Sequence, residues 1–260
     1  MLAYARNAFL TALAHRVDLW GTMLSTLVML LVQYALWRAI YAAGSGEIGG
    51  FTLSEMLTYV LLGRVVATFT SPEVTFWLQI RVRRGTIALD LARPIDMQLV
   101  LFAQGLGTNL FRLVAVGIPA FGLLWGLGLT PLPGPDRLLL FALSLVLGYL
   151  ILFGLNFLLG LVILQTGSGN GLDDLEEMVI RLFSGRFLPV TLFPDWLRAV
   201  SRALPFEGIY YLPLAIYTGA IAPSEMALAL GRQALWCAAL LLAGRLLWAR
   251  AVQRMVVQGG

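Results

Sequence analysis

The chain has 260 residues, of which 59% are hydrophobic and only 12% are charged, so it cannot present an ordinary water-facing surface. All 18 basic residues are arginine, which excludes a phosphate-binding loop because that motif needs a lysine on the phosphates. One histidine and one cysteine exclude a Cys/His metal site and any intramolecular disulfide. The composition predicts an integral membrane protein, whose net charge of +4 reflects membrane orientation rather than nucleic-acid binding.

The N-terminal part predicts an interfacial helix followed by a membrane span. Residues 1–18 form an amphipathic pattern, which is typical of a helix that lies in the membrane interface. The first span is expected at about residues 19–41, where Trp20 and Trp37 provide an aromatic anchor near each end. The glycine-rich stretch 44–50 predicts an extracellular turn.

Further apolar stretches predict the second, third and fourth spans at about residues 53–70, 98–129 and 137–165, and the sixth and last span at about residues 224–248. The fifth span, between the fourth and the sixth, is harder to define. Its apolar part, about residues 178–188, is too short to cross alone unless the preceding acidic turn, residues 172–177, is helical too. Proline-broken pieces follow within residues 189–223 and predict extracellular re-entrant helices.

These elements predict an all-α polytopic protein with six transmembrane helices, forming one permease-like domain over residues 1–260. Arginines are more frequent in the segments that this topology places inside, which favours cytoplasmic positions for both termini. Residues 71–96 form the long cytoplasmic connection between the second and third spans. A short helix there, with Phe76, Trp77, Ile80, Arg81 and Arg84, would offer a soluble partner an apolar face and a cationic edge. The alternative is a loop whose arginines only satisfy the positive-inside rule.

The same connection carries a motif with family character. Ile80, then Gly85-Thr86-Ile87-Ala88, then Leu91, Arg93 and Pro94 follow the second span. A second motif runs from Leu188 to Arg198 and continues through Leu204-Pro-Phe206 and Tyr211-Leu-Pro213. Together they resemble the membrane subunit of a type-two ABC transporter, and the resemblance covers essentially the whole chain. Arg186-Phe187 departs from the small residues that many such subunits have there.

The resemblance implies an ATP-driven exporter in the bacterial plasma (inner) membrane, with the chain itself neither an enzyme nor a holder of cofactors. Two permease subunits, the same or similar chains, would form the pathway at their interface within membrane lipid. Two separate ATPase subunits would bind ATP and magnesium. A coupling helix would dock into a groove of each ATPase, and the residues expected to serve it are Phe76, Trp77, Ile80, Arg81, Arg83, Arg84, Gly85, Arg93 and Pro94.

A second group of residues is expected at the pathway or its outer gate: Arg64, Arg181, Arg186, Pro189, Phe193, Pro194, Trp196, Pro205 and Phe206. An arginine within a span is costly, so it faces protein or a wet cavity. Arg64 and Arg181 could therefore meet anionic head groups in the pathway. The alternative is structural pairing, for which Arg181 has Glu177 one helical turn away.

Two other classes of function stay open. An energy-independent channel or a secondary transporter, without an ATPase partner, would need a charged or broken-helix ion site. An intramembrane enzyme would need acid, base or metal groups that are largely absent. The acidic run from Asp173 to Glu177 is interpreted as a solvated cytoplasmic helix start rather than a cation site. The sequence does not identify the substrate.

Overall fold

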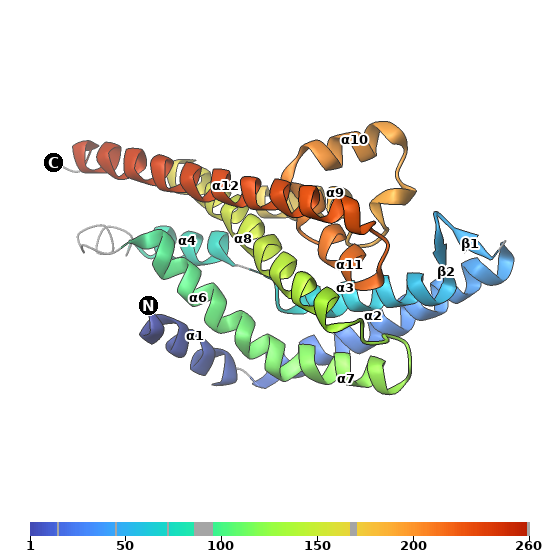
Figure 1. Ribbon diagram of the computed structural model, residues 1–260. Coiled ribbons are helices and arrows are strands. Elements are labelled where there is room, and N and C mark those ends of the chain that lie inside the picture. Colours follow the sequence, from blue (N-terminus) through green and yellow to red (C-terminus); the bar gives the residue numbers. More distant parts are fainter. Residues whose placement is uncertain (15, 45, 72, 86–95, 167–170, 259–260) are drawn as a thin grey trace.

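The computed structural model describes residues 1–14, 16–44, 46–71, 73–85, 96–166 and 171–258, and helices dominate this part of the chain (Figure 1). The expected all-α fold is confirmed. The α-helices are α1 (Leu2–Ala14), α2 (Arg16–Ala43), α3 (Leu53–Thr68), α4 (Val74–Arg83), α6 (Met97–Arg112), α7 (Ile118–Gly126), α8 (Pro135–Thr166), α9 (Leu172–Phe183), α10 (Asp195–Ala203), α11 (Tyr211–Thr218) and α12 (Pro223–Gln258). The shorter elements are β1 (Glu47–Ile48), β2 (Phe51–Thr52), the π-helix η1 (Leu113–Gly117) and the 3₁₀-helices η2 (Val190–Leu192) and η3 (Pro205–Gly208).

Four helical stretches of the described chain are long and apolar enough to cross a membrane: Leu19–Ala43, Met97–Gly126, Pro135–Thr166 and Pro223–Ala251. They correspond to the first, third, fourth and last expected spans. The expected second and fifth spans fall on α3, with 16 residues, and α9, with 12 residues. At 1.5 Å per residue these helices reach only about 24 and 18 Å, less than the roughly 30 Å of bilayer hydrocarbon.

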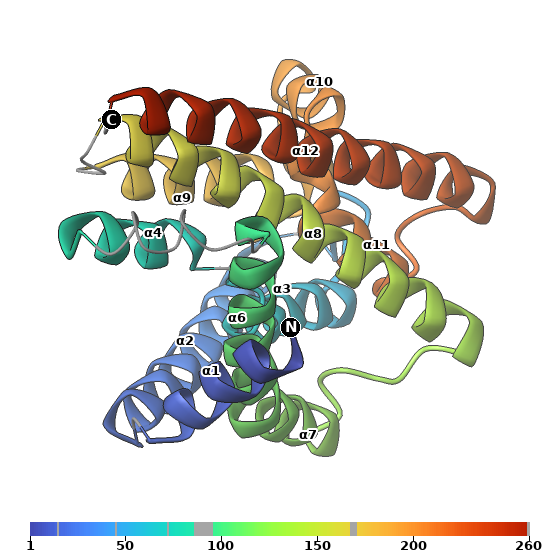
Figure 2. The ribbon, with the colours of Figure 1, turned by 90° about the vertical axis from the view of Figure 1, so that its left-hand side faces the viewer.

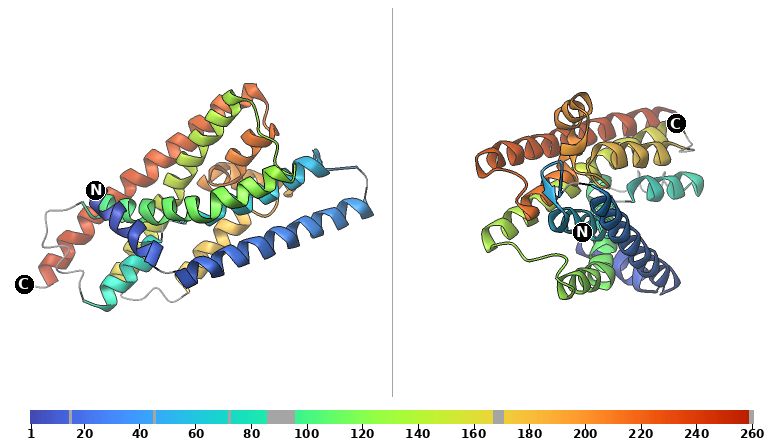
Figure 3. Two further views of the ribbon diagram at one scale, coloured as in Figure 1. Left: turned by 90° about the horizontal axis from the view of Figure 1, so that it is seen from below. Right: turned by 90° about the vertical axis from the view of Figure 1, so that its right-hand side faces the viewer.

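The helices form an elongated bundle whose two ends differ in character. α12 packs along α8, α1 along α6 and α2 along α3, while α4 and α11 both pack on α8 (Figure 2). The N-terminus, α4 and the end of α12 lie at one end of the bundle, and the turn between α2 and α3 lies at the other (Figures 1 and 3). Both ends of the chain therefore lie on the side of α4.

A glycine turn and a helix cap place α3 in the middle of the core. β1 and β2 form an antiparallel hairpin around Gly49 and Gly50, which adopt φ angles of 61° and 80°. Such left-handed pairs match the twist of a two-residue hairpin and favour glycine. Thr52 and Glu55 then form a reciprocal capping box that starts α3. Most of α3 is buried, and Tyr59 at its centre is completely enclosed.

The third membrane helix is interrupted by a wide turn. α6 continues through the π-helix η1 into α7, with Pro119 at the start of α7. Proline has no amide hydrogen, and its ring clashes with the carbonyl four residues earlier in a regular α-helix. The π-turn before it accommodates both defects without ending the helix.

The acidic segment and its continuation differ from the expectation at one point. The acidic turn is helical, since α9 begins directly after Gly171, whose φ angle is 79°. The helix nevertheless ends at Phe183 rather than near Leu188. Gly185, with a φ angle of 75°, turns the chain out of the helix, because the left-handed region ends an α-helix.

The outer surface of the bundle is apolar along its long helices. On α12, Leu228, Leu235 and Leu242 recur every seventh residue and are all at least 60% exposed. A contiguous exposed leucine stripe of this length suits contact with lipid rather than water. On the other side, Phe9 of α1 packs edge-to-face on Phe111 of α6, with ring centroids 5.5 Å apart. α1 therefore lies against α6 instead of projecting away from the bundle.

Candidate functional site

α4 lies within the expected coupling segment, and side chains from a neighbouring helix hold its N-terminus. The first amides of an α-helix have no intrahelical acceptor. Here the Val74 and Thr75 amides donate to Oδ1 of Asn156 on α8, at 2.9 and 3.3 Å. Just before the helix, the Glu73 carboxylate forms an ion pair with Arg112 at the end of α6. One side chain from α8 and one from α6 thus fix the start of α4.

The underside of α4 is packed into α8. Val74 and Leu78 are completely buried, and they share a cluster with Phe153 and Phe157 of α8. Gly160 of α8 lies directly beneath Leu78, and a β-carbon there would collide with the leucine side chain. The absence of a side chain at Gly160 therefore lets the two helices approach closely. α4 is a rigid part of the bundle rather than a loose loop.

The acidic start of α9 also belongs to this assembly. Asn156 Nδ2 donates to Oε2 of Glu176 at 2.7 Å, and Nε2 of Gln79 on α4 donates to Asp173. Glu176 lies in the second turn of α9, outside the four long membrane helices. Burial raises the pKa of its carboxyl to about 7, against the lowering effect of the Asn156 hydrogen bond. The expectation of a fully solvated acidic run was wrong for Asp173 and Glu176, because both face neighbouring helices.

The expected coupling residues divide into exposed and internal positions. Phe76 is 54% exposed and packs edge-to-face on half-buried Trp77. Ile80 is also half-buried. Arg84 and Gly85 are exposed, and the φ angle of 66° at Gly85 follows the end of the helix. Arg93, Pro94 and the side chain of Arg83 lie outside the described residues.

Arg81 does not contribute to the exposed edge. Its guanidinium donates from Nη2 to Oε1 of Gln104 at 3.0 Å and lies 2.9 Å from the sulfur of Met97 through Nη1. Both partners belong to α6, so Arg81 connects α4 to α6. Between α1, α4 and α6 lies a cavity of about 650 Å³, which Phe76, Trp77 and Arg84 help to line.

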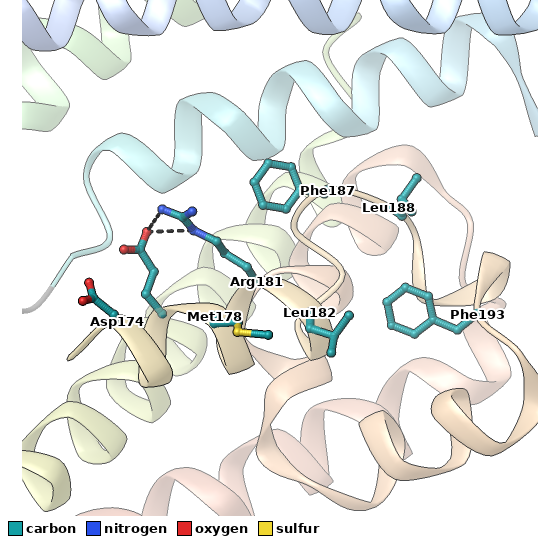
Figure 4. A pocket seen from close by; sticks show the side chains of 8 residues that line it. Asp174, Met178, Arg181, Leu182, Phe187, Leu188 and Phe193 are labelled. Carbon is teal, nitrogen blue, oxygen red and sulfur yellow. Dashed lines mark hydrogen bonds and ion pairs between the residues drawn. The ribbon is translucent and has the colours of Figure 1, made fainter. Parts of the chain in front are cut away.

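A second candidate site is a cavity of about 530 Å³ beside α9 (Figure 4). Its lining combines two carboxylates, one arginine and a set of apolar side chains: Asp174, Glu177, Met178, Arg181, Leu182, Phe187, Leu188 and Phe193. Nε of Arg181 donates to Glu177 at 2.9 Å, so the intrahelical pair is present. Figure 4 shows Arg181 and Phe187 pointing toward α3.

Arg64 of α3 and Arg186 lie next to this cavity. Arg64 is half-buried, and its buried Nε has no hydrogen-bond partner among the described residues. The charges of Arg186 and Arg181 both act on its guanidinium. The guanidinium carbon of Arg186 lies 5.6 Å from the centroid of Tyr210 and 5.8 Å from that of Phe187, so it stacks on both rings.

The segment after α9 is held in place by hydrogen bonds to buried elements. The Tyr59 hydroxyl donates to the Gly185 carbonyl at 2.6 Å, and the Tyr211 amide donates to the Ser184 carbonyl at 2.9 Å. Further along, Nη2 of Arg198 donates to the carbonyl of Phe193 at 3.0 Å. The turn that carries Arg186 is therefore fixed against α3 and α11.

The other expected gate residues do not form one surface. Pro189, Phe193 and Pro205 are buried, whereas Pro194 and Trp196 are exposed. Phe206 is half-buried and packs on Phe183, with ring centroids 5.6 Å apart. Of the whole expected set, the cavity is lined by Arg181 and Phe193.

A polar network at the opposite end of the bundle was missed by sequence reasoning. Nε2 of Gln233 on α12 donates to the carbonyls of Ser144 and Gly208, at 2.7 and 2.8 Å. The Ser144 hydroxyl donates back to Gln233 Oε1 at 3.0 Å. Polar residues inside the expected spans, such as Asn156 and Gln233, were the signal available in the sequence, because buried polar groups need partners.

Comparison with known proteins adds one finding. Residues 27–259 match a family model described as "ABC-2 family transporter protein". The match includes α3, α4, the cavity beside α9 and the proline-rich outer segment. No curated protein and no solved structure matches the chain significantly.

Proposed function

The chain belongs to the ABC-2 transporter family, and from this premise we propose that it is the permease subunit of an ATP-driven exporter that works with separate ATPase subunits. The observation that carries the proposal is the family match over residues 27–259 in a chain without lysine. Because a phosphate-binding loop needs its lysine, ATP and magnesium would bind to the partner subunits.

In this proposal α3 and the apolar second half of α9 complete a set of six crossings. Both helices are shorter than the hydrocarbon is thick, which is tolerated where protein covers the ends and satisfies the freed backbone groups. Tyr59, Ser184, Gly185 and Tyr211 supply such hydrogen bonds around the end of α9. The end of the bundle with α4 and both termini would face the cytoplasm of a bacterial inner membrane.

α4 acts as the coupling helix. Phe76 and Arg84 are exposed along the cavity between α1, α4 and α6, and the ATPase would contact them from that side, while the buried side of α4 is fixed to three helices. Glu73 pairs with α6, the helix amides bind Asn156 of α8, and Gln79 binds Asp173 of α9. A displacement of α4 driven by ATP would therefore move α6, α8 and α9 together, which gives the coupling a continuous physical route.

The substrate pathway would lie between two permease subunits, the second being the same or a similar chain. α9 supports this placement because Leu175 and Met178 are 57% and 64% exposed, and Met178 also lines the cavity beside α9. A second subunit that covers these apolar residues would close the cavity into the pathway.

The proposal is tested by purifying the tagged chain from its host in mild detergent and assaying co-purified proteins and ATP hydrolysis. We expect a stoichiometric ATPase that is lost in Phe76→Asp and Arg84→Glu. Arg250→Glu is the matched control, since Arg250 is an exposed arginine of α12 at the same end of the bundle. A chain that purifies alone and without hydrolysis would overturn the proposal in favour of a channel or a secondary transporter.

A further inference from the structure

Two arginines beside the α9 cavity have no carboxylate partner among the residues that the structure describes. Arg181 is paired with Glu177, whereas no ion pair between described residues involves Arg64 or Arg186. A guanidinium carries five N–H donors, and the buried Nε of Arg64 has no acceptor in this part of the chain. A partly buried guanidinium group without a carboxylate partner is costly unless an anion binds to it.

The backbone segments that carry Arg64 and Arg186 are fixed close together. A β-carbon on Gly63, the residue before Arg64, would lie 3.6 Å from the carbonyl oxygen of Arg186. Tyr59, one turn earlier on α3, binds the carbonyl of Gly185. Tyr210 holds Arg186 from the other side through its ring, and its hydroxyl lies 3.0 Å from that of Thr70. Like charges held together by a rigid scaffold create a positive potential that attracts an anion.

The neighbouring cavity adds an apolar wall to this cationic group. Met178, Leu182 and Phe187 line the cavity and are 64%, 49% and 46% exposed. Figure 4 shows Phe187 on the lining, and the guanidinium carbon of Arg186 lies 5.8 Å from the centroid of the Phe187 ring, so the apolar wall adjoins Arg186. Asp174 and Glu177 line the same cavity, and the Glu177 carboxylate is paired with Arg181. The site would therefore take one charged end and one apolar end of the same molecule.

We propose that Arg64 and Arg186 bind the anionic head of an amphiphile whose tail lies on Met178, Leu182 and Phe187. This deepens the proposed function and rests on it, because it assigns the transported substrate to the class of anionic amphiphiles. Phosphate or carboxylate heads match the planar forks of guanidinium groups, which bind such oxygens in pairs.

The test measures binding to the purified full-length permease in nonionic detergent. The probe is a fluorescent lysophosphatidic acid, competed by lysophosphatidylcholine of the same chain length and, separately, by inorganic phosphate. We expect the phosphate monoester to bind at least about tenfold more tightly than the zwitterion, because the monoester carries more negative charge and lacks the choline cation, which the two arginines would repel. Arg64→Gln and Arg186→Gln should each weaken its binding by a similar factor.

Arg38→Gln is the matched control, since Arg38 also stacks on a tyrosine, Tyr34, but lies on α2 away from the cavity. Should Arg64→Gln fail to elute as a folded protein, Arg64→Lys and Arg186→Gln give the answer. Unchanged binding in the cavity variants, or equal loss in Arg38→Gln, would overturn the proposal. If inorganic phosphate displaced the probe as strongly as unlabelled lysophosphatidic acid does, the assignment to an amphiphile would be overturned. Because binding needs no ATPase, its outcome is separate from the test of the exporter.

Discussion

Replacing Asn156 by leucine should disconnect α4 from the bundle while leaving most of the packing intact. The side chain makes three hydrogen bonds: it accepts from the Val74 and Thr75 amides and donates to Glu176. At about 1 kcal/mol net for each bond, the variant loses about 3 kcal/mol of stability. Leucine has the same number and branching of side-chain heavy atoms as asparagine, so the substitution leaves no cavity and the loss reflects the polar contacts.

The matched control is Gln233→Leu at the opposite end of the bundle. Gln233 also makes three hydrogen bonds, two to carbonyls and one from the Ser144 hydroxyl. Thermal unfolding of the two purified variants should therefore show losses of similar size. Only Asn156→Leu should also lower the amount of substrate transported per ATP hydrolysed, because Asn156, unlike Gln233, contacts the proposed coupling helix.

The assay compares substrate movement and ATP hydrolysis in proteoliposomes that contain the complete complex. The expected result for Asn156→Leu is continued hydrolysis with reduced transport, and for Gln233→Leu an unchanged ratio of the two. An equal ratio in both variants would refute the reasoning, since it would mean that the α4 contacts carry no more of the coupling than a distant network does.

Two further predictions concern α9 and α1. The folded-state pKa of Glu176, about 7, lies above its ordinary 4.5, so the native protein binds more protons than the unfolded chain between these values. Wild-type stability should therefore fall as pH rises from about 5 to about 8, whereas Glu176→Gln should lose this component, and a rise in wild-type melting temperature over that range would contradict it. Gly107→Ala should detach α1 from α6, because its β-carbon would collide with the backbone of Ala5, while Gly122→Ala meets nothing. Faster proteolysis within α1 in the first variant alone is the expected readout, and equal rates in both would be inconsistent with the packing of α1.

The long apolar helices could be predicted because a lipid solvent constrains sequence strongly. A run without charges from Leu138 to Leu172 has few structures open to it, and α8 fills most of that run. A turn at the glycine-rich stretch 44–50 was also predicted, and Gly49 and Gly50 adopt the two positive φ angles, but the short strands that make it a hairpin were not predicted. In these segments local chemistry alone determines the structure.

The contacts of the site were not predictable in the same way, because they depend on which helices become neighbours. Asn156 lies 82 positions from Val74 in the sequence, and nothing local pairs them. The acidic start of α9 resembles a solvated helix end by composition, yet Glu176 contacts α8. The early end of α9 at Phe183 coincides with the positive φ angle at Gly185, and a single glycine in the sequence does not reveal which backbone angle it adopts.

The wide turn at Leu113–Gly117 has a consequence for how this chain tolerates change in length. A π-turn contains one residue more than the α-helical turn it replaces. Because the wide turn takes up this extra residue, the faces of α6 and α7 have the relative orientation that a continuous α-helix would give them. Anywhere else in the span, adding or removing a residue would rotate one half of the helix by about 100° against the other. A deletion within this turn would leave Arg112 and Leu124 facing as before, but it would also place Pro119 in a regular α-helical turn, where its ring clashes with a carbonyl. A shortened turn should therefore be tolerated only together with replacement of Pro119.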